Sequence, residues 1–217
     1  MSKTYFSCTA AVMALALLAG CSTSKPTNPE TAQPSASKTE ETKAPTLKTG
    51  REAFQPMYVM AHGWAGDARP WLLQSVPTTD SDGKDGKHSV WRSSFASPSL
   101  HALKSFVWSG SHAEGASEPG VTAGVEDKSY NPNNSSTQIF DIAFLKVDSG
   151  KAFEVAQKHG GEKLTSGKNP LPVNYIADWN AAKNTLTWHV IYGPDVRSPK
   201  LKIAVNATTG EYINTEK

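Results

Sequence analysis

Cys21 is the residue whose chemistry the sequence defines best, because its thiol lies directly after a segment that can be cut away. A polar lead with Lys3 and an apolar run over residues 10–18 have the pattern of a signal peptide. A membrane-spanning helix needs about 20 apolar residues, and this run ends in the polar residues 22–26 after roughly half that length. We therefore expect the run to be removed and a different group to anchor the protein.

The four residues Leu18-Ala19-Gly20-Cys21 resemble the lipobox of bacterial lipoproteins. In that family the cysteine thiol receives diacylglycerol, cleavage follows on its N-terminal side, and the new amine takes an acyl chain such as palmitate. The resemblance implies a signal peptide over residues 1–20 and lipidation of Cys21, with each buried CH₂ contributing about 0.8 kcal/mol to membrane attachment. An ordinary secretory signal with an incidental cysteine is the alternative. Because Ser22 and not Asp follows the cysteine, the resemblance implies the outer membrane, facing the periplasm, if the host has two membranes.

His62 and Gly63 are the residues that favour a hydrolase. Residues 61–67 are similar to the His-Gly oxyanion loop of lipases, in which backbone N–H groups stabilise a tetrahedral intermediate. The chain contains no G-x-S-x-G motif, and the adjacent Ser111 and His112 do not place a hydroxyl against an imidazole as a catalytic triad requires. We therefore expect no catalytic residues, and an esterase remains the alternative.

The acidic residues of the segment from 80 to 91 are spaced almost like the ligands of a calcium loop. Asp80, Asp82 and Asp85 resemble the acidic residues of such a loop, but Lys84 stands at the fifth position, Asp85 stands where glycine must turn the chain, and Trp91 stands where a bidentate Glu is needed. The six histidines show no spacing typical of zinc ligands. We therefore expect a solvated loop here, no metal and no other cofactor.

The composition limits the stabilising chemistry and the partners. Of the two cysteines, Cys8 leaves with the signal peptide and Cys21 takes the lipid, so we expect a body without disulfides. Residues 22–50 contain seven Thr, four Ser, four Pro and one large aliphatic residue, which predicts a disordered tether over residues 21–52, either as a spacer or as a consequence of biogenesis. The 16 cations and 16 anions of residues 53–217 indicate no nucleic-acid partner.

The remaining chain is expected to fold as α+β, in two similar small units over residues 53–137 and 138–217, each with a helix packed on a curved antiparallel sheet. The two halves have similar sequence patterns, because Trp91 begins a strand pair that ends at Gly110 and Trp188 begins a strand pair that ends at Gly210. The predicted helices cover residues 58–68, ended by Pro70, and 150 or 151 to 159, which Asp148 caps and Gly160-Gly161 ends. The predicted strands cover residues 89–95, 100–108, 138–147, 172–179, 185–192 and 200–206.

Residues 147–152 with Ala156, residues 188–192 and residues 203–212 resemble a PepSY domain, a small secreted module with a helix on a curved antiparallel sheet. The resemblance covers roughly the last third of the chain, and residues 53–110 only weakly. Asn206 stands where the family usually has Asp. The family is regarded as non-catalytic and is thought to bind or restrain peptidases of the cell envelope, so the resemblance supplies no catalytic residue.

The six tryptophans can form either a core or a ligand surface. Trp91 and Trp188 hold equivalent positions in the two halves, so we expect them between helix and sheet. Trp71 beside Pro70 and Trp179 beside a turn are the candidates for contact with a peptide or glycan. The sequence thus predicts a membrane-anchored, non-catalytic binding or regulatory module for an envelope protein or peptidase. An envelope hydrolase and a purely structural spacer lipoprotein are the alternatives, and the oligomeric state stays open.

Overall fold

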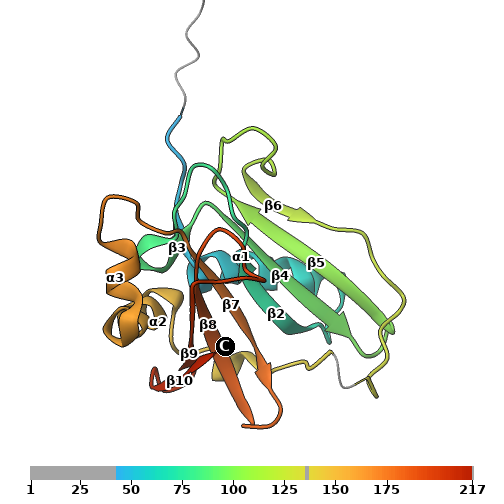
Figure 1. Cartoon of the computed structure of the whole chain (residues 1–217). Coiled ribbons are helices and arrows are strands. Elements are labelled where there is room, and N and C mark those ends of the chain that lie inside the picture. Colours follow the sequence, from blue (N-terminus) through green and yellow to red (C-terminus); the bar gives the residue numbers. More distant parts are fainter. Residues whose placement is uncertain (1–42, 135–136, 217) are drawn as a thin grey trace, which may run out of the picture. The chain divides into compact units, whose positions relative to one another are not determined.

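The computed structural model describes residues 43–134 and 137–216, which belong to one compact unit running from Glu41 to Lys217. The predicted signal peptide, Cys21 and most of the predicted tether lie outside the described residues. The unit is α+β, with a large antiparallel sheet and helices packed on one of its faces (Figure 1).

Eight strands form the large sheet in the order β10-β9-β8-β7-β2-β4-β5-β6, and all neighbours are antiparallel. A small second sheet pairs β1 with β3. The helices are α1 (Gly50–Trp64), α2 (Ser149–Ala156) and α3 (Glu162–Thr165), with 3-10 turns at Lys84–Gly86 and Ile142–Phe144 and a π-helical turn at Gln157–Gly161. The strands are β1 (Lys48–Thr49), β2 (Arg69–Ser75), β3 (Lys87–His88), β4 (Val90–Ser97), β5 (Ala102–Ser109), β6 (Gly120–Ala123), β7 (Val173–Asn180), β8 (Thr185–Tyr192), β9 (Leu201–Asn206) and β10 (Tyr212–Glu216).

The sheet order divides the unit into two halves of the same design. In each half a helix precedes four sheet strands that follow one another as neighbours: α1 with β2, β4, β5 and β6, then α2 with β7, β8, β9 and β10. The halves join where β2 pairs with β7, with Leu73 opposite Ala177. The two small units expected from the sequence therefore share one continuous sheet.

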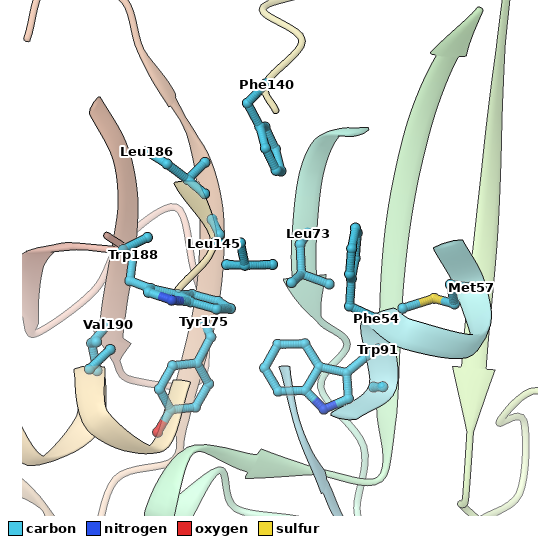
Figure 2. Close-up of a cluster of buried hydrophobic side chains, with 14 of the residues drawn as sticks. Phe54, Met57, Leu73, Trp91, Phe140, Leu145, Tyr175, Leu186, Trp188 and Val190 are labelled. Atoms are coloured by element: carbon cyan, nitrogen blue, oxygen red, sulfur yellow. The ribbon is translucent and has the colours of Figure 1, made fainter. Parts of the chain in front are cut away.

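Trp91 and Trp188 occupy matching places in the core, as predicted, and neither is exposed. The indole Nε1 of Trp91 donates to the carbonyl of Lys48 at 2.8 Å, and that of Trp188 donates to the carbonyl of Val147 at 2.9 Å. Each acceptor lies two residues before the first residue of the helix in its own half. The rings meet edge to face, with centroids 6.3 Å apart, inside the cluster of buried side chains in Figure 2.

The N-terminal ends of α1 and α2 are tied together by side chains of the second half. The Asp148 carboxylate accepts from the backbone N–H of Arg51 at 2.9 Å and from the hydroxyl of Thr49 at 2.7 Å. The Ser149 hydroxyl accepts from the backbone N–H of Gly50 at 2.7 Å. Because the first N–H groups of a helix have no partner within that helix, these contacts satisfy donors of α1 while fixing the position of α2.

The fold begins earlier than the predicted tether boundary at residue 52. The backbone N–H of Thr46 donates to the carbonyl of Gly110 at 2.8 Å, and Glu52 accepts from the N–H of Thr49 at 2.9 Å at the start of α1. The predicted helix over residues 58–68 overlaps α1 but is wrong at both ends. Residues 69–75 form strand β2, which was not predicted, because Pro70 was expected only to end the preceding helix.

The predicted strand over residues 138–147 is also wrong. Residues 142–144 form a 3-10 turn, which Asp141 caps by accepting from the N–H of Ala143 at 2.8 Å. The helix that Asp148 caps is interrupted at Gly160, as predicted, because that residue has a non-helical φ of 108°, and a separate helix, α3, begins at Glu162. The prediction for residues 185–192 is confirmed as β8, and β7 and β9 each start one residue later than predicted.

Two glycines of α1 provide a matched test of the packing around the tryptophan pair. A Cβ at Gly50 would lie 2.6 Å from Cη2 of Trp188, whereas a Cβ at Gly63 would have no neighbour within 4 Å. We expect Gly50→Ala to lower the free energy of unfolding by about 1–3 kcal/mol through overpacking. Gly63→Ala should raise it by about 0.5–1 kcal/mol, because alanine restricts the unfolded chain and favours the helix. Urea denaturation followed by tryptophan fluorescence measures both, and a Gly50→Ala chain as stable as the wild type would contradict the tight packing.

Candidate functional site

A hollow on the sheet face opposite α1 and α2 is lined by both tryptophans that the sequence analysis selected for partner contact. It has a volume of about 490 Å³, and its lining includes Trp71, Trp179, Asp178, His189 and Lys202. Because side chains alternate along a strand, the last three point away from the buried core. The hollow therefore combines aromatic and charged groups on the helix-free face, and we call it the Trp71 hollow.

Trp71 lies on β2 at an irregular point of the sheet. The pairing of β2 with β4 shifts register between Pro70 and Leu72, and the extra residue of such a bulge re-aims a side chain. Trp71 is half-buried, and its Nε1 is buried without a hydrogen-bond partner among the described residues. The sequence prediction selected this residue but placed it just after a helix, so neither the strand nor the bulge was foreseen.

Trp179 lies near the end of β7 on the same face as Ala177, so its ring lies on the core side of the sheet although the residue borders the hollow. Its ring packs edge to face on Phe144, with centroids 5.0 Å apart, and it contacts the hydrophobic core. It is half-buried, as is Trp71. Three of the six tryptophans are buried, namely Trp91, Trp108 and Trp188, and three are half-buried, namely Trp64, Trp71 and Trp179.

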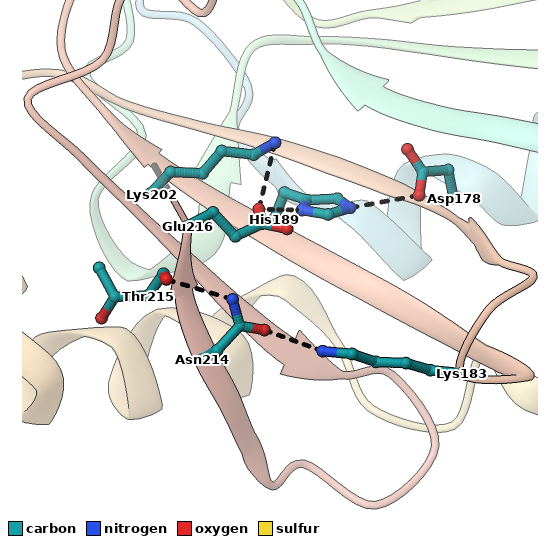
Figure 3. Close-up of polar contacts among 7 residues, drawn as sticks. All are labelled: Asp178, Lys183, His189, Lys202, Asn214, Thr215 and Glu216. Carbon is teal, nitrogen blue, oxygen red and sulfur yellow. Dashed lines mark hydrogen bonds and ion pairs between the residues drawn. The ribbon is translucent and has the colours of Figure 1, made fainter.

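The charged side of the hollow is held by a network that we call the His189 clasp (Figure 3). Nδ1 of His189 lies 2.6 Å from a carboxylate oxygen of Glu216, and Nε2 lies 3.2 Å from Asp178. Nζ of Lys202 lies 3.1 Å from the same Glu216 oxygen. The four residues come from β8, β10, β7 and β9, so the clasp fastens the last strand to three others.

The clasp shifts the pKa values of its own members. Burial disfavours the imidazolium, but the hydrogen bond and charge of Asp178, together with Glu216, raise the pKa of His189 above its ordinary value of 6.5. Burial also acts to raise the pKa of Glu216, but the charge and hydrogen bond of His189, with Lys202, bring it below its ordinary value of 4.5. Each partner of the clasp therefore favours the charged form of the other, the imidazolium of His189 and the carboxylate of Glu216.

The clasp was not predicted from the sequence. Alternation along residues 185–192 already puts His189 on the face opposite Trp188, and that was the available signal. Its partner Glu216 lies on β10, which the sequence analysis did not recognise as a strand.

Other residues that suggested chemistry lie elsewhere and have structural partners. The Ser111 hydroxyl donates to Asp80 at 2.6 Å, and Ser89 donates to the other oxygen of the same carboxylate at 2.6 Å. Burial acts to raise the pKa of Asp80, but these hydroxyls outweigh it and lower the pKa to about 2. The Ser111 hydroxyl thus donates to a carboxylate and not to an imidazole.

His62 lies in the last turn of α1, with its ring centroid 4.3 Å from that of Tyr58. Asp82 accepts from the backbone N–H of Lys84 at 3.0 Å, and Asp85 has a left-handed conformation with φ 55°. Within residues 43–134 and 137–216, no cluster of three or more His, Cys, Asp or Glu side chains is placed to hold a metal ion. The helices in these same ranges are all too short or too polar to cross a membrane.

No family model, no curated protein and no solved structure matches this chain.

The His189 clasp gives stability a defined pH dependence. The raised pKa of His189 contributes stability that is complete below about pH 6.5 and is lost as the pH rises through the folded-state pKa. The lowered pKa of Glu216 contributes stability that is complete above about pH 4.5 and is lost as the pH falls through its folded-state pKa. We expect His189→Gln to cost about 1.5–3 kcal/mol at pH 5.5, the range for hydrogen bonds to charged groups, and clearly less at pH 9.

Urea denaturation at the two pH values measures this difference. Lys183→Gln is the matched control, because Lys183 makes an exposed contact of 3.0 Å to Asn214 on β10 without an imidazole (Figure 3). This substitution should lower the free energy of unfolding only slightly, and by the same amount at both pH values. If His189→Gln lowered the free energy of unfolding equally at pH 5.5 and pH 9, the imidazolium would not stabilise β10.

Proposed function

We propose that this chain is a lipid-anchored envelope protein that binds another envelope protein through the Trp71 hollow without catalysing a reaction. The observation that carries the proposal is that Trp71 and Trp179 line one hollow together with Asp178, His189 and Lys202. Tryptophan flanked by charged groups is typical of the residues that dominate protein interfaces. The fixed charges of the His189 clasp would set the orientation of the partner.

The partners of the polar residues support binding over hydrolysis. Both ring nitrogens of His189 face carboxylates, which leaves neither nitrogen to take a proton from a nucleophile. Gly63 lies within α1, and an oxyanion loop needs N–H groups that point at a substrate. The resemblance to PepSY modules, together with the α+β arrangement of helix on antiparallel sheet, makes a peptidase the partner class that we favour.

The proposed anchor is the lipid on Cys21, and Cys8→Ser is a matched control for Cys21→Ser because Cys8 lies in the part that the signal peptidase would remove. We expect Cys21→Ser to move the protein from the membrane fraction to the soluble fraction or to block processing. Cell fractionation with mass spectrometry of the N-terminus measures both. Cys8→Ser should behave as the wild type. A Cys21→Ser chain that still fractionates wholly with membranes would show that the anchor lies elsewhere.

Binding through the hollow predicts a crosslinked partner that depends on Trp71. We expect chemical crosslinking in cells to give a recurring partner, and Trp71→Ala to reduce its yield by about tenfold or more, as for interface tryptophans. Trp64→Ala is the control, because Trp64 is also half-buried but does not line the hollow. A structural spacer would give no recurring partner, and labelling of the chain by a serine-directed activity probe would favour the hydrolase.

A further inference from the structure

A groove runs along α1 on the helical side of the sheet and is separate from the Trp71 hollow. It consists of two adjoining hollows of about 160 and 510 Å³, which share Tyr58 and Ile142. One wall is the stripe Arg51, Gln55, Tyr58 and His62 of α1, whose spacing puts them on one face of the helix. The other wall is the segment from residue 139 to residue 145. We call this feature the α1 groove, and it shares no lining residue with the Trp71 hollow.

The middle of the α1 groove is apolar and is left open. Tyr58, Phe140 and Pro70 line it, and Ile142 on its rim is 40% exposed. A large apolar side chain that stays exposed beside a hollow is typical of an interaction surface.

The two ends of the groove differ in charge. At one end, the Arg51 guanidinium is held by a hydrogen bond of 2.9 Å from Nη1 to the carbonyl of Lys146, and a guanidinium has further N–H donors with which to bind a carboxylate. At the other end lie Asp67 and Asp141, whose two negative charges are offset in part by Arg69. Asp67 is fixed by the Ser97 hydroxyl at 2.6 Å and the backbone N–H of Ser99 at 2.8 Å.

The length of the groove indicates the form of the ligand. From Arg51 to His62 the helix rises about 16 Å, at about 1.5 Å per residue. An extended chain covers the same length with about five residues, at about 3.3 Å per residue. The smaller hollow has a volume of only about 160 Å³, which favours a single extended chain over a helix about 10 Å in diameter.

We propose that the α1 groove binds an extended segment of a partner protein, about five residues long, apolar in the middle, with an acidic group at Arg51 and a basic group at Asp67 and Asp141. This goes beyond the proposed function, because the groove shares no lining residue with the Trp71 hollow. The chain thus has two recognition surfaces.

The test uses the full-length chain, immobilised, with three mixtures of capped pentapeptides that have Leu, Ile, Val or Phe at the three middle positions. The first mixture has Lys at one end and Glu at the other, in both orders, the second has Lys at both ends, and the third has Glu at both ends. Mass spectrometry quantifies the retained peptides. We expect the mixed-charge set to be retained about threefold more than either other set, as exposed ion pairs allow.

Substitutions in the groove identify the site. Arg51→Glu should shift the preference to the set with Lys at both ends, and Asp141→Asn, which retains a capping oxygen, should remove the preference for a basic end. Ile142→Ser should reduce retention about fivefold or more through lost apolar contact. Gln55→Trp, an exposed position, should block the groove without disturbing the core.

The controls are Val59→Ser, an exposed apolar position of α1 outside the groove, and Trp71→Ala in the hollow. Both variants should retain peptides as the wild type does. A failure of the proposal for the Trp71 hollow is thereby distinguished from a failure of the proposal for the α1 groove. Denaturation curves show that each variant is folded. No retention of any set, equal retention of all three, or retention unchanged by Arg51→Glu and Gln55→Trp would overturn the proposal.

Discussion

The edge-to-face contact between Trp91 and Trp188 is the interaction on which the rest of the structure depends. Each indole lies on the central strand pair of its own half and donates to the carbonyl that precedes the helix of that half. The contact therefore fixes two helices and two sets of strands relative to one another. Asp148 and Ser149 complete the joint, because they satisfy backbone donors of α1 from the other half of the chain.

The sequence predicted a strand best where side chains of the two faces alternate and where another strand pairs on each side. Residues 185–192 meet that condition between β7 and β9. Residues 138–147 have similar apolar character, but no strand pairs with them, and the Asp141 carboxylate caps a turn there instead. Pro70 favours the end of a helix locally, yet it is tolerated in β2 beside a bulge. Trp71 and Trp179 could be selected as candidates from their neighbours in the sequence, whereas the His189 clasp depended on β10, whose place at the sheet edge is set by tertiary packing.

Both proposed recognition surfaces arise where the two halves meet. The Trp71 hollow takes Trp71 from β2 and its charged residues from β7, β8 and β9. The α1 groove takes one wall from α1 and the other from residues 139–145, which lead into α2. Neither half alone contains either surface, although each half repeats the same arrangement of helix and strands. The proposed recognition surfaces thus depend on both halves and on the pairing of β2 with β7.

That pairing also governs the order in which the chain acquires its structure. The strand opposite β2 is supplied about a hundred residues later, since Leu73 pairs with Ala177. Until β7 has been made, β2 has unpaired backbone N–H and C=O groups along one side, and a free strand edge of this kind pairs readily with other chains. The first half therefore cannot reach its final state ahead of the second. While β7 is absent, the free edge of β2 favours aggregation of the incomplete chain.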